Sequence, residues 1–129
     1  MTFAITAPYA AILTVLYVVL SLLVIRARTK TTIALGDKGD DRLLEASRRQ
    51  MNFVENVPLT LTLMMLAEAG GASAMVVNIA GIVLVVARLV HPFGITVTKT
   101  FHPLRFAGAV ATQVVQLAMV VVLVMHRFA

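Results

Sequence analysis

The sequence contains no cysteine and little charge, and each of these absences excludes a class of protein. Without cysteine, the 129-residue chain has no disulfide, no thiolate nucleophile of its own and no cysteine-ligated zinc site. Only 13% of the residues are charged, against about 25% in soluble domains, which is too little for a surface fully exposed to water. The three histidines are scattered along the chain, so we predict no metal site.

Long apolar runs take the place of the missing charge. The chain is 60% hydrophobic with a mean hydropathy of +0.94, and a helix that crosses the hydrocarbon core needs roughly 20 residues. We predict a single all-α membrane domain over residues 1–129, a bundle of four transmembrane helices at about 4–25, 42–69, 74–91 and 104–125. Within the last helix, Gln113 and Gln116 are expected to hydrogen-bond a neighbouring helix.

The positive charge indicates membrane topology better than it indicates nucleic-acid binding. The net charge is +5, but the basic residues lie at the ends of apolar runs and do not alternate with aromatic residues. No Lys or Arg precedes the first run, so we expect a retained helix and no cleaved signal peptide. Ten of the eleven Lys and Arg residues fall within 26–49 or at Arg88, Lys99 and Arg105, and only Arg127 lies at the other end. The positive-inside rule then predicts a cytoplasmic position for the charged end and an outside position for both termini.

Several polar residues lie within or beside the apolar runs, where they are costly. Arg48, Asn52 and Glu55 are spaced i, i+4, i+7 and share one helix face, and Arg88 and His91 share a face of the next helix. Because a short turn joins the two helices, both sets reach the same leaflet and predict a polar pocket with both signs of charge. Spacing alone leaves open a structural alternative, an ion pair of Glu55 with Arg88 or Arg48 that fixes helix packing.

The same residues carry a resemblance to a known family. The run from Arg48 to Pro58, RRQMNFVENVP, resembles the R-x-Q-x-N-x-x-E-x-x-P pattern in the second helix of the MAPEG family, the membrane-associated proteins of eicosanoid and glutathione metabolism. Residues 87–94, ARLVHPFG, resemble that family's A-R-x-x-H-x-x-G pattern, and residues 105–108, RFAG, resemble the start of the fourth helix in its bacterial branch. The resemblance covers about residues 45–129, and the second-helix pattern is specific because so many polar residues are rare in a membrane helix.

The resemblance implies a fold, an assembly and an activity. Members of the family are four-helix bundles that form homotrimers, with glutathione sites between subunits that open to the cytoplasm. By that resemblance the chain is a glutathione-dependent enzyme of the bacterial inner membrane, of the glutathione transferase or peroxidase type, and glutathione is its bound thiol co-substrate. Its second substrate would be a lipophilic electrophile from the bilayer.

The resemblance also assigns roles to individual residues. The pocket that binds glutathione would be lined by Arg48, Asn52, Glu55, Arg88 and His91. Arginine forks suit the two carboxylates of glutathione, and Glu55 suits its ammonium group. Gln50 is a candidate for hydrogen bonding to the peptide part, Arg28 or Arg26 for a further cation from the neighbouring chain, and Arg105 for the arginine that activates the thiol.

Two positions depart from the family pattern and leave other functions open. Members that make eicosanoids have tyrosine where this chain has Asn56 and Ile95. A non-catalytic relative that binds a thiol or no ligand is therefore one alternative. A small four-helix multidrug exporter is another, although such exporters rely on an acidic residue in the first helix, and residues 4–25 contain none.

Overall fold

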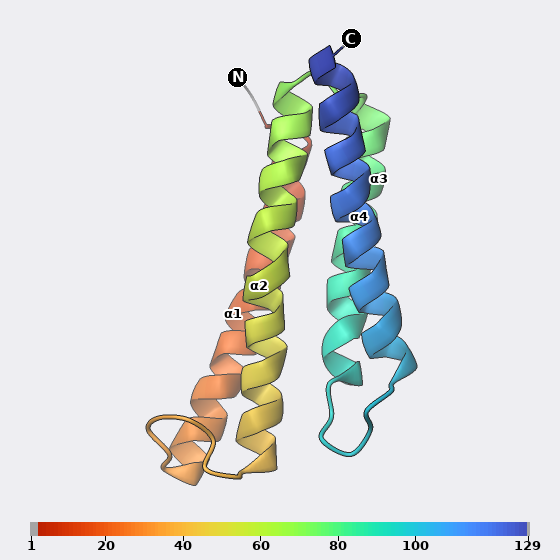
Figure 1. Cartoon of the computed structure of the whole chain (residues 1–129). Coiled ribbons are helices and arrows are strands. Elements are labelled where there is room, and N and C mark those ends of the chain that lie inside the picture. The colour runs from red at the N-terminus through yellow and green to blue at the C-terminus, as the bar shows by residue number, and fades with distance from the viewer. Residues whose placement is uncertain (1–2, 129) are drawn as a thin grey trace.

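The computed structural model describes residues 3–128, with the backbone alone for residues 127 and 128. Within this part the chain is all-α, with four long helices: α1 (Thr6–Thr31), α2 (Asp41–Ala69), α3 (Ala74–Val90) and α4 (Pro103–Phe128). A short 3-10 helix, η1 (His91–Gly94), follows α3. The helices run up and down in turn, so that both termini lie at one end of the bundle and the loops 32–40 and 95–102 lie at the other (Figure 1).

Three of the four helices have the length and the composition to cross a membrane. They are α1, the segment Ala74–Gly94 and the segment Pro103–His126, with mean hydropathies of 2.4, 2.1 and 2.1. Their many valines and isoleucines favour strands in water, but a helix satisfies every backbone hydrogen bond within one segment, which lipid requires. Helix α2 is not in this group, because charged and polar residues occur along its length, among them Asn52, Glu55 and Glu68. Its 29 residues extend about 43 Å at 1.5 Å per residue and run beside α1 along the bundle (Figure 1).

The ends of the helices follow from local chemistry. Helix α1 continues to Thr31, beyond the expected boundary near residue 25, because a helix does not have to stop where the hydrocarbon ends. The carboxylate of Asp40 caps α2 by accepting the Leu43 N–H at 2.8 Å. Gly71, at a φ of 86°, makes the tight turn between α2 and α3, where the sequence predicts one. Pro92 has no N–H to continue α3, and the chain tightens there into η1.

The core combines apolar packing with a few polar contacts between helices. Leu13, Met64, Leu84 and Met119, one from each long helix, are at most 1% exposed. Gln116 Nε2 donates to Thr60 Oγ1 at 2.9 Å, which confirms the predicted hydrogen bond from α4 to a neighbouring helix. Gln113, in contrast, is exposed.

At the end with the termini, a carboxylate joins α2 to the start of α1. Glu68 accepts the N–H groups of Ile5 and Thr6, both at 2.9 Å, and the Thr6 hydroxyl at 2.6 Å. The first N–H groups of a helix have no partner within the helix, and Glu68 supplies one from another element. This contact fixes the top of α1 against α2 near the turn into α3.

The first prediction concerns orientation. Ten of the eleven Lys and Arg residues belong to the end of the bundle with the two long loops, so the positive-inside rule places that end in the cytoplasm. A reporter that is active only in the cytoplasm should therefore be inactive when fused after Ala129 and active when inserted in the loop 32–40. The opposite pattern in the two fusions would show that the bundle is inverted.

Candidate functional site

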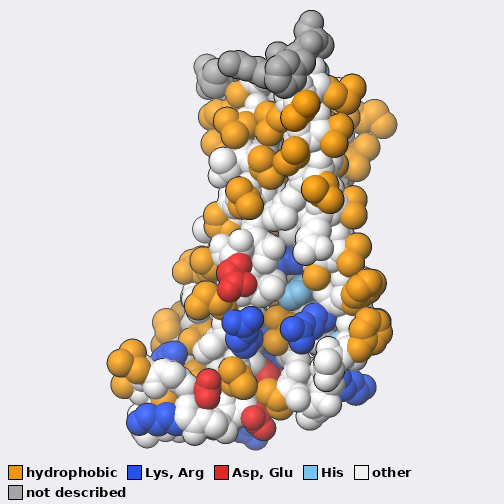
Figure 2. Space-filling view, viewed as in Figure 1, with side chains coloured by type: hydrophobic (Ala, Val, Ile, Leu, Met, Phe, Trp, Pro, Cys, Tyr) orange, Lys and Arg blue, Asp and Glu red, His pale blue; other side chains and the backbone are white. Residues whose placement is uncertain are grey.

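A cavity of about 290 Å³ opens at the charged end, between α2, the segment after η1 and the start of α4. The side chains that α2 and α4 contribute to its lining are mostly polar, and those of the segment after η1 are mostly apolar. The residues that line it are Leu44, Glu45, Arg48, Asn52, Ile95, Thr96, Val97 and Arg105. Figure 2 shows cationic, acidic and histidine side chains gathered on this half of the molecule, while the half toward the termini is largely hydrophobic.

An ion pair on α2 holds the segment that forms one wall. Glu45 and Arg49 are one turn apart, and Arg49 Nη2 lies 3.3 Å from Glu45 Oε2. The same guanidinium donates to the Ile95 carbonyl at 2.9 Å, and Glu45 accepts the Val97 N–H at 2.9 Å. The pair therefore binds residues 95–97 to α2 through backbone groups, so this contact does not depend on which side chains residues 95–97 have. Sequence reasoning missed this role, although the i, i+4 spacing of opposite charges was a signal for the pair itself.

Close backbone packing places Arg105 at the mouth of the cavity. A side chain on Gly94 would collide with the backbone of Arg105, so only glycine allows η1 to approach the first turn of α4 this closely. The Arg105 side chain itself is exposed and has no hydrogen-bond or ion-pair partner among the described residues. Arg48 on α2 is likewise exposed and without a partner. Two free guanidinium groups from different helices thus line one cavity.

Glu55 lies outside this arrangement. It is exposed, and the structural alternative that pairs it with Arg88 or Arg48 is wrong, because the one ion pair among the described side chains joins Arg49 to Glu45. Its position on the outer face of α2 leaves its carboxylate free for a group from outside the chain.

Arg88 is buried inside the bundle and does not line the cavity. The side chain is 2% exposed, although it is charged. Nη1 donates to Asn52 Oδ1 at 2.9 Å and Nη2 donates to the Gly108 carbonyl at 3.0 Å. Arg88 thereby joins α3 to α2 and α4, and Asn52, which does line the cavity, is oriented by this bond.

His91 is also buried, at 3% exposure, and stands apart from the cavity wall. It packs where α3 meets α4, and a side chain on Gly108 would come within 2.7 Å of the His91 Cβ. Arg88 and His91 therefore share a face, as their spacing predicts, but that face is turned into the bundle.

The two other predicted contact residues are not brought to the cavity. Gln50 Nε2 donates to Ser21 Oγ at 2.8 Å and so joins α2 to α1. Arg28 Nη1 donates to the carbonyls of Ile33, Ala34 and Gly36 at 3.2, 3.3 and 3.1 Å, which orders the first half of the loop 32–40. Of the predicted site, the single chain brings together Arg48, Asn52 and Arg105. Within the described residues, no group of three His, Asp or Glu side chains is placed to hold a metal ion.

We expect Arg88→Ala to destabilise the bundle. The change removes the donor to the Asn52 oxygen and one donor to the Gly108 carbonyl, which keeps the Thr112 hydroxyl, and it opens a void among three helices. Lost hydrogen bonds to a charged group cost about 1.5–3 kcal/mol each in favourable cases, so thermal unfolding in detergent should show a loss of at least about 2 kcal/mol. Arg48→Ala, which removes an exposed arginine without a partner, is the matched control and should change stability little. Equal stability of the two variants would contradict a structural role for Arg88.

Comparison with known proteins agrees with the motifs. The model of the MAPEG family matches residues 6–125. The chain is 38% identical over 90 residues to the Inner membrane protein YecN of Escherichia coli (strain K12). The match covers 70% of this chain and 69% of that protein. The protein of the same name from Escherichia coli O6:H1 matches to the same extent. No solved structure matches the chain.

The family match spans all four helices and includes both cations and the asparagine of the cavity. Together with its apolar helices, it shows that this chain is an integral multi-pass membrane protein that belongs to the MAPEG family.

Proposed function

We propose that the protein is a glutathione-dependent membrane enzyme of the transferase or peroxidase type, acting on lipophilic electrophiles. The observation that carries the proposal is the pair of free guanidinium groups, Arg48 and Arg105, at one cavity. Arginine binds a carboxylate through paired hydrogen bonds, which suits Arg48 to a carboxylate of glutathione, and a guanidinium near a sulfur favours the thiolate, which suits Arg105. Asn52 stands beside them with its amide NH2 available, because its oxygen is already bonded to Arg88.

The size of the cavity and the position of Glu55 support a site completed by a second chain. About 290 Å³ lies at the lower limit of ligand pockets, which range over roughly 300–1,000 Å³. Glu55 is exposed on the outer face of α2, where a carboxylate at membrane depth needs a partner. The ammonium group of glutathione held between two chains would provide one. We therefore propose a homotrimer with its thiol sites between subunits.

The proposed reaction begins with activation of the thiol. A guanidinium near the sulfur favours the thiolate, which is the nucleophile, and the thiol proton passes to solvent. The thiolate then attacks the electrophilic carbon, forms the C–S bond and releases any leaving group. In the peroxidase case it attacks a hydroperoxide oxygen, the O–O bond breaks, an alcohol leaves, and the sulfenic acid so formed reacts with a second glutathione to give the disulfide and water. We assign the activating role to Arg105, because it is exposed at the cavity mouth and has no acidic partner.

We propose that the other family positions divide into contacts and supports. Arg48, Asn52 and Glu55 are proposed to touch glutathione. Arg88 and His91 are buried and are proposed to hold Asn52 and the start of α4 in place. Gln50 and Arg28 bond within their own chain, and we propose that they shape the charged end of α1 for the neighbouring subunit.

One observation favours a non-catalytic thiol-binding relative as the second candidate. Ile95 lines the cavity where eicosanoid-making members have tyrosine, and its side chain is 8% exposed. It offers no hydroxyl to a ligand. Binding would then rest on the arginines and Asn52 alone, and turnover of a chromogenic electrophile by the purified protein with glutathione separates the two candidates.

We expect Arg105→Ala to lower turnover much more than it lowers glutathione affinity. Loss of the guanidinium should raise the pKa of the bound thiol, and one unit of pKa corresponds to about 1.4 kcal/mol, or about tenfold less thiolate at a pH below that pKa. The rate deficit should shrink as the pH rises, because the thiol of the variant then ionises as well. Thiolate absorbance in the ultraviolet, titrated with pH, measures this pKa directly.

Lys99→Ala is the control, because Lys99 is an exposed cation near the same end that does not line the cavity. It should leave the bound-thiol pKa unchanged, and Arg105→Lys should restore part of the effect. An unchanged pKa in Arg105→Ala would mean that Arg105 only marks the membrane boundary of α4.

We expect native mass spectrometry of the detergent-solubilised protein to show a trimer. Glutathione should bind the trimer and leave any monomer unoccupied, because the proposed site takes Arg48 and Arg105 from one chain and a wall from the next. Glu55→Gln should reduce this binding without unfolding the protein, since Glu55 has no partner in its own chain. A monomer that binds glutathione as tightly as the assembly would rule out a shared site.

A further inference from the structure

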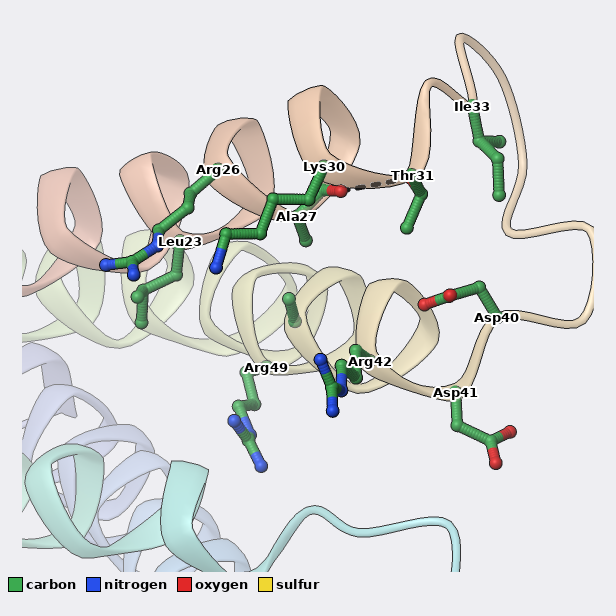
Figure 3. A pocket seen from close by; sticks show the side chains of 11 residues that line it. Leu23, Arg26, Ala27, Lys30, Thr31, Ile33, Asp40, Asp41, Arg42 and Arg49 are labelled. Carbon is green, nitrogen blue, oxygen red and sulfur yellow. Dashed lines mark hydrogen bonds between the residues drawn. The ribbon is translucent and has the colours of Figure 1, made fainter.

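A second and larger cavity lies between the end of α1, the start of α2 and the loop that joins them. Its volume is about 690 Å³. Leu23 and Ala27 of α1, Ile33 of the loop and Ala46 of α2 form its apolar part, and apart from Thr31 the rest is charged. Figure 3 shows the side chains of Arg26 and Lys30 extending from α1 toward α2, with Arg42 along α2. Arg48, Asn52 and Arg105, the proposed thiol contacts, do not line it.

Three of the four cations that line this cavity have no side-chain partner among the described residues, whereas one of its two acidic residues already accepts a hydrogen bond. Arg26, Lys30 and Arg42 have no side-chain hydrogen bond or ion pair with the described residues. Arg49 also lines the cavity but is paired with Glu45. Asp40 caps α2 through the Leu43 N–H, and Asp41 remains as the second acid. The arrangement favours a bound anion.

The depth of these cations matches the headgroup layer of a membrane. From Thr6 to Ile25, α1 contains no charged residue, and about 20 residues at 1.5 Å each span the hydrocarbon core of about 30 Å. Arg26 is therefore at the boundary and Lys30 is one turn beyond it. Lipid phosphates lie at this level.

The part of α1 that precedes these cations in the sequence has an apolar face suited to an acyl chain. Ile12, Val19 and Leu23 are 49%, 46% and 44% exposed. Together with Arg26 and Lys30 they are spaced i, i+7, i+11, i+14, i+18, which places all five on one face of the helix. One exposed apolar stripe thus leads directly to the cation cluster.

We propose that this cavity binds the headgroup of an anionic phospholipid. Arg26, Lys30 and Arg42 face its phosphate and second negative group, and one acyl chain lies along the stripe of Ile12, Val19 and Leu23. A zwitterionic lipid fits less well, because its ammonium group would meet the cations. A soluble phosphate has no chain to place on the stripe. The site is independent of the proposed thiol chemistry.

The test is a lipid titration of the detergent-solubilised protein, followed by native mass spectrometry of bound lipid. Dioleoyl phosphatidylglycerol should bind more tightly than dioleoyl phosphatidylcholine, and the preference should fall as salt is added. The double variant Lys30→Gln/Arg42→Gln should weaken phosphatidylglycerol binding by about 25-fold, since each basic residue near a membrane surface contributes about 1 kcal/mol, or about fivefold. Binding of phosphatidylcholine should change little.

The double variant Lys38→Gln/Lys99→Gln is the matched control. It removes two exposed cations from the same end of the molecule, neither of which lines the cavity, and it should keep the wild-type preference. Equal binding of both lipids by the wild-type protein would overturn the proposal, as would an equal loss in both double variants. Inorganic phosphate at constant ionic strength should not compete with phosphatidylglycerol, and full competition would show a site for a free anion instead.

Discussion

The two hydrogen bonds of the buried Arg88 determine how the functional end of this bundle is built. An arginine within an apolar bundle must find acceptors, because a charged group without them is expensive at membrane depth. The acceptors are Asn52 Oδ1 on α2 and the Gly108 carbonyl on α4. A side chain on Gly108 would collide with the Ala87 carbonyl, so a glycine at this position is needed for α4 to come close to α3. One side chain of α3 thereby sets the distance and rotation of two other helices.

The polar residues of the bundle divide into two groups with different consequences. Some are bonded within the chain: Arg88 at the charged end through both Nη atoms, although its buried Nε has no partner among the described residues, Gln116 with Thr60 midway, and Glu68 at the start of α1. Others, namely Arg48, Glu55 and Arg105, are exposed and have no partner among the described residues. The first group holds the helices together. The second group is costly in a lone chain, which is why we propose that a ligand and neighbouring subunits bind on that face.

The same reasoning separates the two cavities at the charged end. The smaller one combines free cations with an amide and a rigid wall, which Glu45 and Arg49 hold by its backbone. This arrangement suits a small ligand with several polar groups. The larger one is open, lies beside an apolar stripe of α1 and presents cations at the depth of lipid headgroups. This arrangement suits an amphiphile. We therefore relate the net charge of +5 to the predicted membrane topology and to two proposed binding surfaces of different chemistry.

Hydropathy was enough to predict α1, α3 and α4, because in lipid an apolar run of this length can only be a helix. Helix α2 and the Gly71 turn were predicted from local helix and turn signals, and the gathering of cations at one end from the positions of Lys and Arg along the chain. Spacing correctly predicted that Arg88 and His91 share a face, and the motif predicted the family.

The partners of these residues could not be predicted. Helical spacing shows which side chains lie together on one helix, but the rotation of each helix against the others decides what they meet. Tertiary structure alone turned Arg88 toward Asn52 and Gly108, left Glu55 on the outside and brought Arg105 to the cavity of Arg48. The physical reason is that close approach at Gly94 and Gly108 sets how the helices pack, and a periodic sequence pattern contains no information about that approach.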